Sequence, residues 1–184
     1  ISGNMEHILH AKLKDSLFFW TEDSKTPLVK KRDELKNLVF LKGAGSMLEK
    51  SERLESLADV LGPAMGLSAD EVSILKRAAH LSKADLLTHM VGEFPELQGI
   101  MGKHYAKGQG EAEAVSQAIG EQYLPRTVSD QLPGTRIGGA LSLIDKMDLV
   151  VACFAMGLEP SSSADPYGLR RSTTAAVKIA LQCN

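Results

Sequence analysis

The spacing of apolar residues is the feature that most constrains how this chain folds. Apolar side chains recur every three or four positions, and they do not alternate with polar ones over any long stretch. Such spacing is typical of α-helices with one buried face, whereas alternation is typical of half-buried strands. The sequence therefore predicts an all-α bundle of about eight helices. The expected helices cover residues 5–20, 27–39, 46–61, 68–90, 97–105, 112–123, 137–156 and 169–181.

Local signals mark the starts of two of these helices. Glu49 follows Ser46 by three residues, and Glu71 follows Ser68 in the same way. This spacing is that of a capping box, in which the serine and glutamate side chains bond to each other's backbone N–H groups. Among the other segments, residues 137–156 are largely apolar and predict a buried helix.

Composition limits the classes of protein to which the chain can belong. Its 184 residues predict one domain, and 43% hydrophobic with 24% charged residues is ordinary for a globular protein. A net charge of −2 provides no overall basic field, so a site for a polyanion must be a local patch. Cys153 and Cys183 match no metal or redox spacing and predict buried free thiols. With no apolar run long enough to span a bilayer, we expect a cytoplasmic protein with no membrane partner. The start Ile-Ser-Gly-Asn is interpreted as that of a piece excised from a longer chain.

Residues 76–102 contain the most obvious candidate metal ligands, which are His80, Asp85, His89 and Glu93. On one continuous helix the two histidines would be separated by about 13.5 Å of rise, too far to share a metal. Asp85 and His89 are four residues apart and would face each other on such a helix. Two ligands alone do not make a tight site, so we expect structural histidines and no metal.

Glycines in the same stretch interrupt an otherwise helical pattern. Gly99 and Gly102 lie where each glycine costs a helix about 1 kcal/mol relative to alanine. We expect a close approach of another helix or backbone to compensate for that cost.

Three short segments bear on the chemistry of the chain. Residues 50–54 read Lys-Ser-Glu-Arg-Leu, residues 78–83 read Ala-Ala-His-Leu-Ser-Lys, and residues 143–146 read Leu-Ile-Asp-Lys. In this order they resemble the ligand-bearing segments of the His-Asp (HD) superfamily of metal-dependent phosphohydrolases. The resemblance implies an HD-domain-like helical bundle.

The ligand positions in these segments are degenerate. Lys50 occupies the place of the first histidine, Ser82 and Lys83 replace the His-Asp dyad, and only Asp145 is retained. Ammonium groups repel a divalent cation, so the resemblance implies a site that binds no metal. We expect the two lysines to pair with Asp145 instead.

Longer runs occur in a fixed order along the whole chain. The most specific is residues 90–102, Met-Val-Gly-Glu-Phe-Pro-Glu-Leu-Gln-Gly-Ile-Met-Gly. The others are residues 3–4, 11–19, 23–28, 83–86, 123–126, 145–148 and 165–171. Together they resemble the β subunit of bacterial glycyl-tRNA synthetase, which contains a degenerate HD domain. The chain is identified as an internal fragment of that subunit.

The resemblance implies a role in protein biosynthesis. The family joins glycine to tRNA(Gly) with ATP and Mg, in an assembly of two α and two β subunits. In that family the α subunit forms the aminoacylation site, and the main role of the β subunit is to bind tRNA. Residues 1–42 would be a helical lead-in and residues 43–184 the degenerate HD-like domain. No Gly-rich phosphate loop or nucleophile–base pair is present, so we expect no catalytic residue and no cofactor in this fragment, which would be inactive alone.

Five residues are candidates for contact with tRNA. Arg170 and Arg171 follow a Pro-Tyr-Gly loop near a helix start, where backbone amides and cations both favour phosphate. Tyr167 is suited to stacking on an unpaired base. Arg126 follows a proline in a loop, and Lys83 belongs to the central segment. For all five the alternative is an ordinary solvated or ion-paired charge.

Two other functions remain open from the sequence. One is a surviving metal-dependent HD phosphohydrolase, against which the missing ligands argue. The other is a purely structural module that docks subunits together.

Overall fold

The computed structural model of the protein describes residues 2–127 and 129–182, whose regular structure is helical. The nearest approach to a strand in these two ranges is an isolated bridge between Val39 and Ser46, so the predicted all-α fold is confirmed. The elements are α1 (Ser2–Ser24), α2 (Leu28–Arg32), η1 (Asp33–Asn37), α3 (Met47–Ala64), α4 (Ala69–Leu81), η2 (Ala84–Leu87), α5 (His89–Glu93), η3 (Pro95–Leu97), α6 (Ile100–Gly108), α7 (Glu113–Glu121), α8 (Arg136–Ala155) and α9 (Leu169–Gln182), where η is a 3-10 helix.

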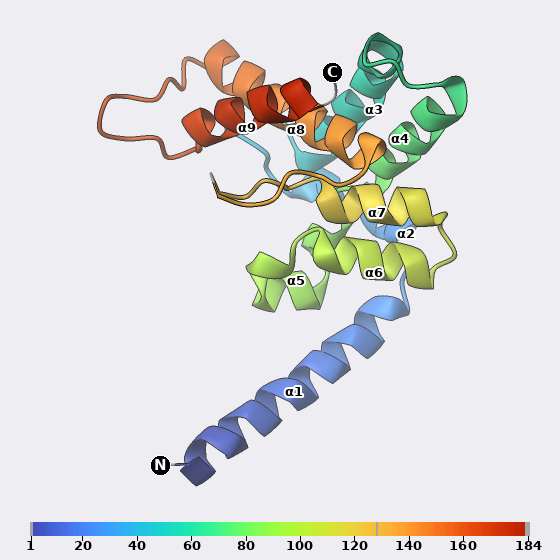
Figure 1. Ribbon diagram of the computed structural model, residues 1–184. Coiled ribbons are helices and arrows are strands. Elements are labelled where there is room, and N and C mark those ends of the chain that lie inside the picture. The colour runs from blue at the N-terminus through green and yellow to red at the C-terminus, as the bar shows by residue number, and fades with distance from the viewer. Residues whose placement is uncertain (1, 128, 183–184) are drawn as a thin grey trace.

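Helix α8 organises the body of the molecule. It packs against α3, α4, α7 and α9, and its Leu141 and Ile144 lie in the main core with Leu54 and Leu75. In Figure 1, α3, α4, α8 and α9 gather on the side away from α1, while α5, α6 and α7 lie nearer to it. Asp145, the residue after Ile144, is therefore held at the edge of the core.

Both capping boxes are present as predicted. Ser46 Oγ accepts the N–H of Glu49 at 3.3 Å, and the Glu49 carboxylate accepts the N–H of Ser46 at 2.6 Å. Ser68 and Glu71 make the same pair of bonds at the start of α4. These local bonds satisfy backbone donors that no helical carbonyl can reach, which is why each helix starts here.

The single helix predicted over residues 68–90 is wrong, because the chain breaks after α4. The Ser82 carbonyl, which would continue the helix, instead accepts a hydrogen bond from Gln122 Nε2 at 2.6 Å. The Leu86 N–H then bonds to the Lys83 carbonyl at 3.2 Å, in the tighter 3-10 pattern. Thr88 caps the next short helix by accepting the N–H of Val91. A contact from Gln122, the residue that follows α7, thus turns one expected helix into three elements, and the spacing of apolar residues does not reveal it.

The side chain of Asp85 packs against the two glycines that follow the break, Gly99 and Gly102. Its Oδ2 atom accepts the N–H of Gly99 at 2.7 Å and that of Gly102 at 3.2 Å, at the start of α6. A Cβ atom on Gly102 would lie 2.8 Å from Ile119 Cγ2 and 3.0 Å from Asp85 Oδ2. Gly99 has φ +78°, a conformation that side chains disfavour. The close approach expected at these glycines is confirmed.

We expect Gly102→Ala to lower the free energy of unfolding by about 2 kcal/mol, because overpacking outweighs the gain in helix propensity. The matched control is Gly92→Ala, since a Cβ atom there meets nothing within 4 Å. That control should be neutral or slightly stabilising. Urea denaturation of both variants tests the claim, and equal stabilities would contradict the close packing around Gly102.

Asp23 attaches α1 to the body. Its buried carboxylate accepts the backbone N–H groups of His89 and Met90 at 2.9 and 3.0 Å, and the Tyr105 hydroxyl at 3.0 Å. Burial alone would raise the pKa of Asp23, but these bonds lower it. Beyond this anchor α1 projects from the body (Figure 1) and exposes Leu17, at 67%.

The predicted burial of residues 137–156 holds only for the N-terminal part of α8. Toward its C-terminal end Val151 and Phe154 are 60% and 51% exposed. Cys153 is a buried free thiol as expected, whereas Cys183 lies outside the described residues. Neither α8 nor any other described helix is long and apolar enough to cross a membrane.

Candidate functional site

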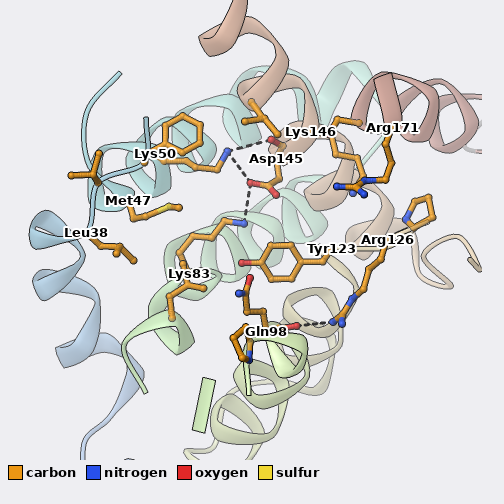
Figure 2. Close-up of a pocket in the computed structure, with 17 residues that line it drawn as sticks. Leu38, Met47, Lys50, Lys83, Gln98, Tyr123, Arg126, Asp145, Lys146 and Arg171 are labelled. Atoms are coloured by element: carbon orange, nitrogen blue, oxygen red, sulfur yellow. Dashed lines mark hydrogen bonds and ion pairs between the residues drawn. The ribbon is translucent and has the colours of Figure 1, made fainter. Parts of the chain in front are cut away.

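Three of the four residues whose positions resemble HD ligand positions, Lys50, Lys83 and Asp145, come together in the structure. Lys50 on α3 and Lys83 after α4 each place Nζ 3.0 Å from Asp145 Oδ1 on α8. Figure 2 shows the two ammonium groups reaching Asp145 from different elements. The pairing expected from the sequence is therefore present. The fourth position, Ser82, is buried and donates a hydrogen bond to the Ala79 carbonyl at 2.9 Å.

The lysine–aspartate cluster is almost shielded from water. Lys83 and Lys50 are only 2% and 4% exposed. Lys50 also contacts Asp148 at 2.9 Å, and Asp148 accepts a 2.7 Å bond from Arg53 on its other side. Burial acts to raise the pKa of Asp145, but the two ammonium groups together hold it well below its usual range. Asp145 is consequently a carboxylate at any physiological pH.

A cavity of about 540 Å³ opens beside this cluster. Five basic residues and a single carboxylate contribute to its lining, and we call it the basic cavity. These residues are Lys50, Lys83, Arg126, Asp145, Lys146 and Arg171. Even when Asp148 is counted against Lys50, positive charge exceeds negative charge at this site. Such an arrangement attracts anions and repels metal cations.

The pKa of Lys146 reflects the positive charge of the basic cavity. Its Nζ donates to the Leu124 carbonyl at 3.0 Å and to Ser142 Oγ at 2.8 Å. Burial lowers the pKa of Lys146 to about 8, against the opposing influence of Asp145, and the cations Lys83, Arg171 and Lys50 lower it further. With a pKa of about 8, Lys146 stays mostly protonated at pH 7, and a bound anion would raise that pKa again.

The residues predicted to contact tRNA are unequally available. Arg126 donates to the carbonyls of Glu96 and Gln98 at 2.5 and 2.7 Å and so holds the 95–98 turn in place. Lys83 is buried, as described above, which leaves it no surface for direct contact with a macromolecule. Both nevertheless line the basic cavity.

At the start of α9, Asp165 occupies the position where the sequence predicts a phosphate. Its carboxylate accepts the N–H groups of Leu169 and Arg170 at 2.8 and 3.0 Å. The backbone amides of this helix end are therefore already satisfied. The Arg170 side chain bonds to the Ser161 carbonyl, while Arg171 lines the basic cavity. Tyr167 is 39% exposed.

The histidines of the central stretch do not meet Asp85, because the helix that would align them is broken. His80 Nδ1 lies 3.1 Å from Glu55 Oε2, and His89 Nδ1 lies 2.9 Å from Asp23 Oδ1. The proposed facing pair of Asp85 and His89 is therefore wrong. In the described ranges no three His, Cys, Asp or Glu side chains are grouped so as to hold a metal ion.

Several residues that line the basic cavity were not predicted as site residues, among them Lys146 and Tyr123. The ring of Tyr123 lies under Lys83, with Nζ 4.3 Å from the ring centroid. Both residues occur in runs that carry the family resemblance, but a resemblance does not state which residues face one another. The signal that the sequence did contain was the spacing of Asp145 and Asp148. Residues three apart on a helix lie on the same face, and both of these carboxylates contact Lys50.

Comparison with known proteins gives the chain its family. The family model described as "Glycyl-tRNA synthetase beta subunit" matches residues 1–184. The glycine–tRNA ligase β subunit of Desulforamulus reducens is 45% identical over 184 residues, which are 100% of this chain and 26% of that protein. The β subunit of Desulforudis audaxviator is 53% identical over 170 residues, 92% of this chain and 25% of that protein.

A third relative, the β subunit of Moorella thermoacetica, is 46% identical over the whole chain and 26% of its own length. The chain thus spans about a quarter of the length of the curated relatives that it matches. Because the family model covers every residue of the sequence, the chain belongs to the glycyl-tRNA synthetase β-subunit family.

Proposed function

We propose that this chain is part of a glycine–tRNA ligase and that it helps to hold tRNA(Gly). The proposed assembly contains two α and two β subunits, acts in the cytoplasm, and uses ATP and Mg at a site outside this segment. Membership of the β-subunit family supports the ligase role. The observation that carries the tRNA role is the excess of cations around the basic cavity in a chain whose net charge is −2.

The proposed RNA contact is centred on the start of α9. Arg170 and Arg171 are exposed, and Tyr167 precedes them on an open loop. Arginine donors suit phosphate, and an exposed tyrosine suits an unstacked base. Arg126 and Lys83 support the surface indirectly, by holding the 95–98 turn and by adding positive charge within the basic cavity.

We interpret residues 43–184 as a degenerate HD-like domain and residues 1–42 as its lead-in. The meeting of Lys50, Lys83 and Asp145 supports this interpretation, because the three positions resemble HD ligand positions in the sequence. The ammonium groups of Lys50 and Lys83 neutralise the carboxylate of Asp145, a role that the metal ion has in an HD hydrolase. In this proposal the domain has kept a scaffold and lost its hydrolytic chemistry.

The test is a double variant, Arg170→Ala with Arg171→Ala, in the assembled α–β enzyme. We expect tRNA(Gly) affinity to fall about tenfold or more at 0.1 M salt, since each arginine supplies a charge-assisted contact. The slope of log affinity against log salt should fall by about 1.5, because two cations no longer release counterions. Fluorescence anisotropy with labelled tRNA across a KCl series measures both quantities.

The matched control is Lys76→Ala with Lys107→Ala, which removes the same charge at positions that do not line the basic cavity. An unchanged affinity and slope in the arginine variant would exclude the α9 contact. If deletion of the segment also leaves the tRNA footprint unchanged but abolishes association with the α subunit, the chain is a structural docking module. Stoichiometric transition metal in elemental analysis would favour the HD phosphohydrolase instead.

A further inference from the structure

The basic cavity has two chemically different sides. Leu38, Val39 and Met47 form an apolar lip on the η1 side, where Val39 is 69% exposed. Figure 2 shows Leu38 and Met47 facing Arg126 and Arg171 across the cavity, with Tyr123 between them. A volume of about 540 Å³ lies within the range of small-molecule sites. The cavity therefore suits a ligand with one apolar, planar part and one anionic part.

The cationic side retains unused hydrogen-bond donors. In the part of the chain that the structure describes, no hydrogen bond or short ion pair engages the Arg171 guanidinium. Lys83 forms an ion pair with Asp145 and lies over the Tyr123 ring, although an ammonium group has three N–H donors. Lys146 uses two of its three donors, on Leu124 and Ser142. These groups gather around one opening with no carboxylate other than Asp145 in the lining.

The internal carboxylates offset this charge only in part, because Asp145 acts on Lys146 and Asp165 acts on Arg171 from beyond ion-pair distance. Asp145 is bonded to both Lys50 and Lys83, and Asp148 is turned toward Lys50 and Arg53. Lys146 and Arg171 thus remain without a carboxylate within ion-pair distance in the described chain. Like charges held together in a partly buried site repel each other, and an anion placed between them relieves that repulsion.

We propose that the basic cavity binds a nucleotide, with its phosphate against Arg171 and Lys146 and its base on the lip formed by Leu38, Val39 and Met47. A phosphate monoester or diester supplies the anion, and a planar heterocycle covers the apolar lip. The nucleotide is either free or one residue of an RNA strand. This inference rests on the proposed function in one respect, because Arg171 belongs both to the basic cavity and to the contact proposed on α9.

The probe is cytidine monophosphate, titrated calorimetrically into the full-length β subunit. The α subunit is omitted so that its ATP site does not contribute. We expect Arg171→Ala to weaken binding about tenfold, as for loss of one charge-assisted contact. Arg170→Ala is the matched control, since Arg170 is an adjacent exposed arginine that does not line the cavity, and it should change affinity less than twofold.

A second pair of variants tests the apolar lip without touching any cation. Val39→Ser should weaken cytidine monophosphate binding about threefold while leaving inorganic phosphate unaffected, because only the nucleoside covers this residue. Val60→Ser is its control, since Val60 is 70% exposed and lies on α3 away from the cavity lining. Both valine side chains are exposed, so neither change should unfold the protein.

Absence of cytidine monophosphate binding, or binding insensitive to both Arg171→Ala and Val39→Ser, would overturn the nucleotide site. Inorganic phosphate binding as tightly as cytidine monophosphate would also overturn it, since the lip would then contribute nothing. Prebound tRNA(Gly) that blocks the probe identifies an RNA residue as the source, whereas independent binding identifies a free nucleotide; both results retain the site. Failure of the α9 contact is recognised separately, by normal tRNA affinity in the Arg170→Ala variant, because Arg170 does not line the cavity.

Discussion

Asp145→Asn is expected to lower the free energy of unfolding by about 3 to 4 kcal/mol, within the range measured when one partner of a buried ion pair is removed. Asparagine keeps the volume of the side chain but not its charge. Lys50 and Lys83 would then be two nearly buried ammonium groups without the carboxylate that both contact at 3.0 Å. Urea denaturation followed by circular dichroism measures the loss.

The control for this prediction is a double-mutant cycle with Lys83→Met. Methionine removes the buried charge at similar volume, so Asp145→Asn should cost at least 1 kcal/mol less in the Lys83→Met background. The pH dependence has a defined sign. Because folding lowers the pKa of Asp145, its stabilising contribution is present above the ordinary carboxyl pKa of about 4 and is lost as the pH falls below it. A loss under 1 kcal/mol at pH 7 would show that the lysines do not depend on Asp145.

Asp85→Ala is expected to destabilise the protein by about 3 kcal/mol. The substitution leaves the N–H groups of Gly99 and Gly102 without the acceptor that now lies 2.7 and 3.2 Å away. A buried donor without a partner costs about 1 to 3 kcal/mol, and two are created here. Hydrogen exchange should show the amides at the start of α6 becoming less protected than those of α8.

Asp85→Asn separates the hydrogen bonds of Asp85 from its charge. The asparagine oxygen still accepts both N–H groups, so this variant should retain most of the stability that Asp85→Ala loses. Burial raises the pKa of Asp85 to about 6, and its Oδ1 atom has no hydrogen-bond partner.

Between pH 4 and 6 the folded protein therefore binds more protons than the unfolded chain, and stability due to Asp85 falls as pH rises. Asparagine does not titrate, so the Asp85→Asn variant lacks this loss. Its free energy of unfolding should therefore rise relative to that of the natural protein between pH 4 and pH 7.5. A constant difference across that range would contradict the raised pKa.

Much of the fold was readable from local sequence alone. Helical periodicity predicted the all-α class and the positions of α8 and α9, because one buried face requires that spacing. The capping boxes at Ser46 and Ser68 were read correctly, since the atoms that bond lie three residues apart. Gly99 and Gly102 correctly predicted a close approach, although the residue that approaches, Asp85, was not identifiable.

The break after α4 and the composition of the site depended on contacts distant in sequence. Gln122 takes the carbonyl of Ser82 across 40 residues, and Asp145 lies 95 residues beyond Lys50. No local pattern encodes such pairs, and only the positional resemblance to HD segments hinted that Lys50, Lys83 and Asp145 meet.

The sequence by itself determined most of the helices, the capping boxes at Ser46 and Ser68, and the family, because these depend on neighbouring residues or on ordered motifs. Only the tertiary structure decided that His89 bonds Asp23 instead of Asp85, and that Lys146 and Arg171 share a cavity with the lysine–aspartate cluster. The physical reason is that charge and hydrogen-bond partners are chosen by proximity in space. Proximity follows from how α3, α7, α8 and α9 pack, and that packing is a property of the whole chain.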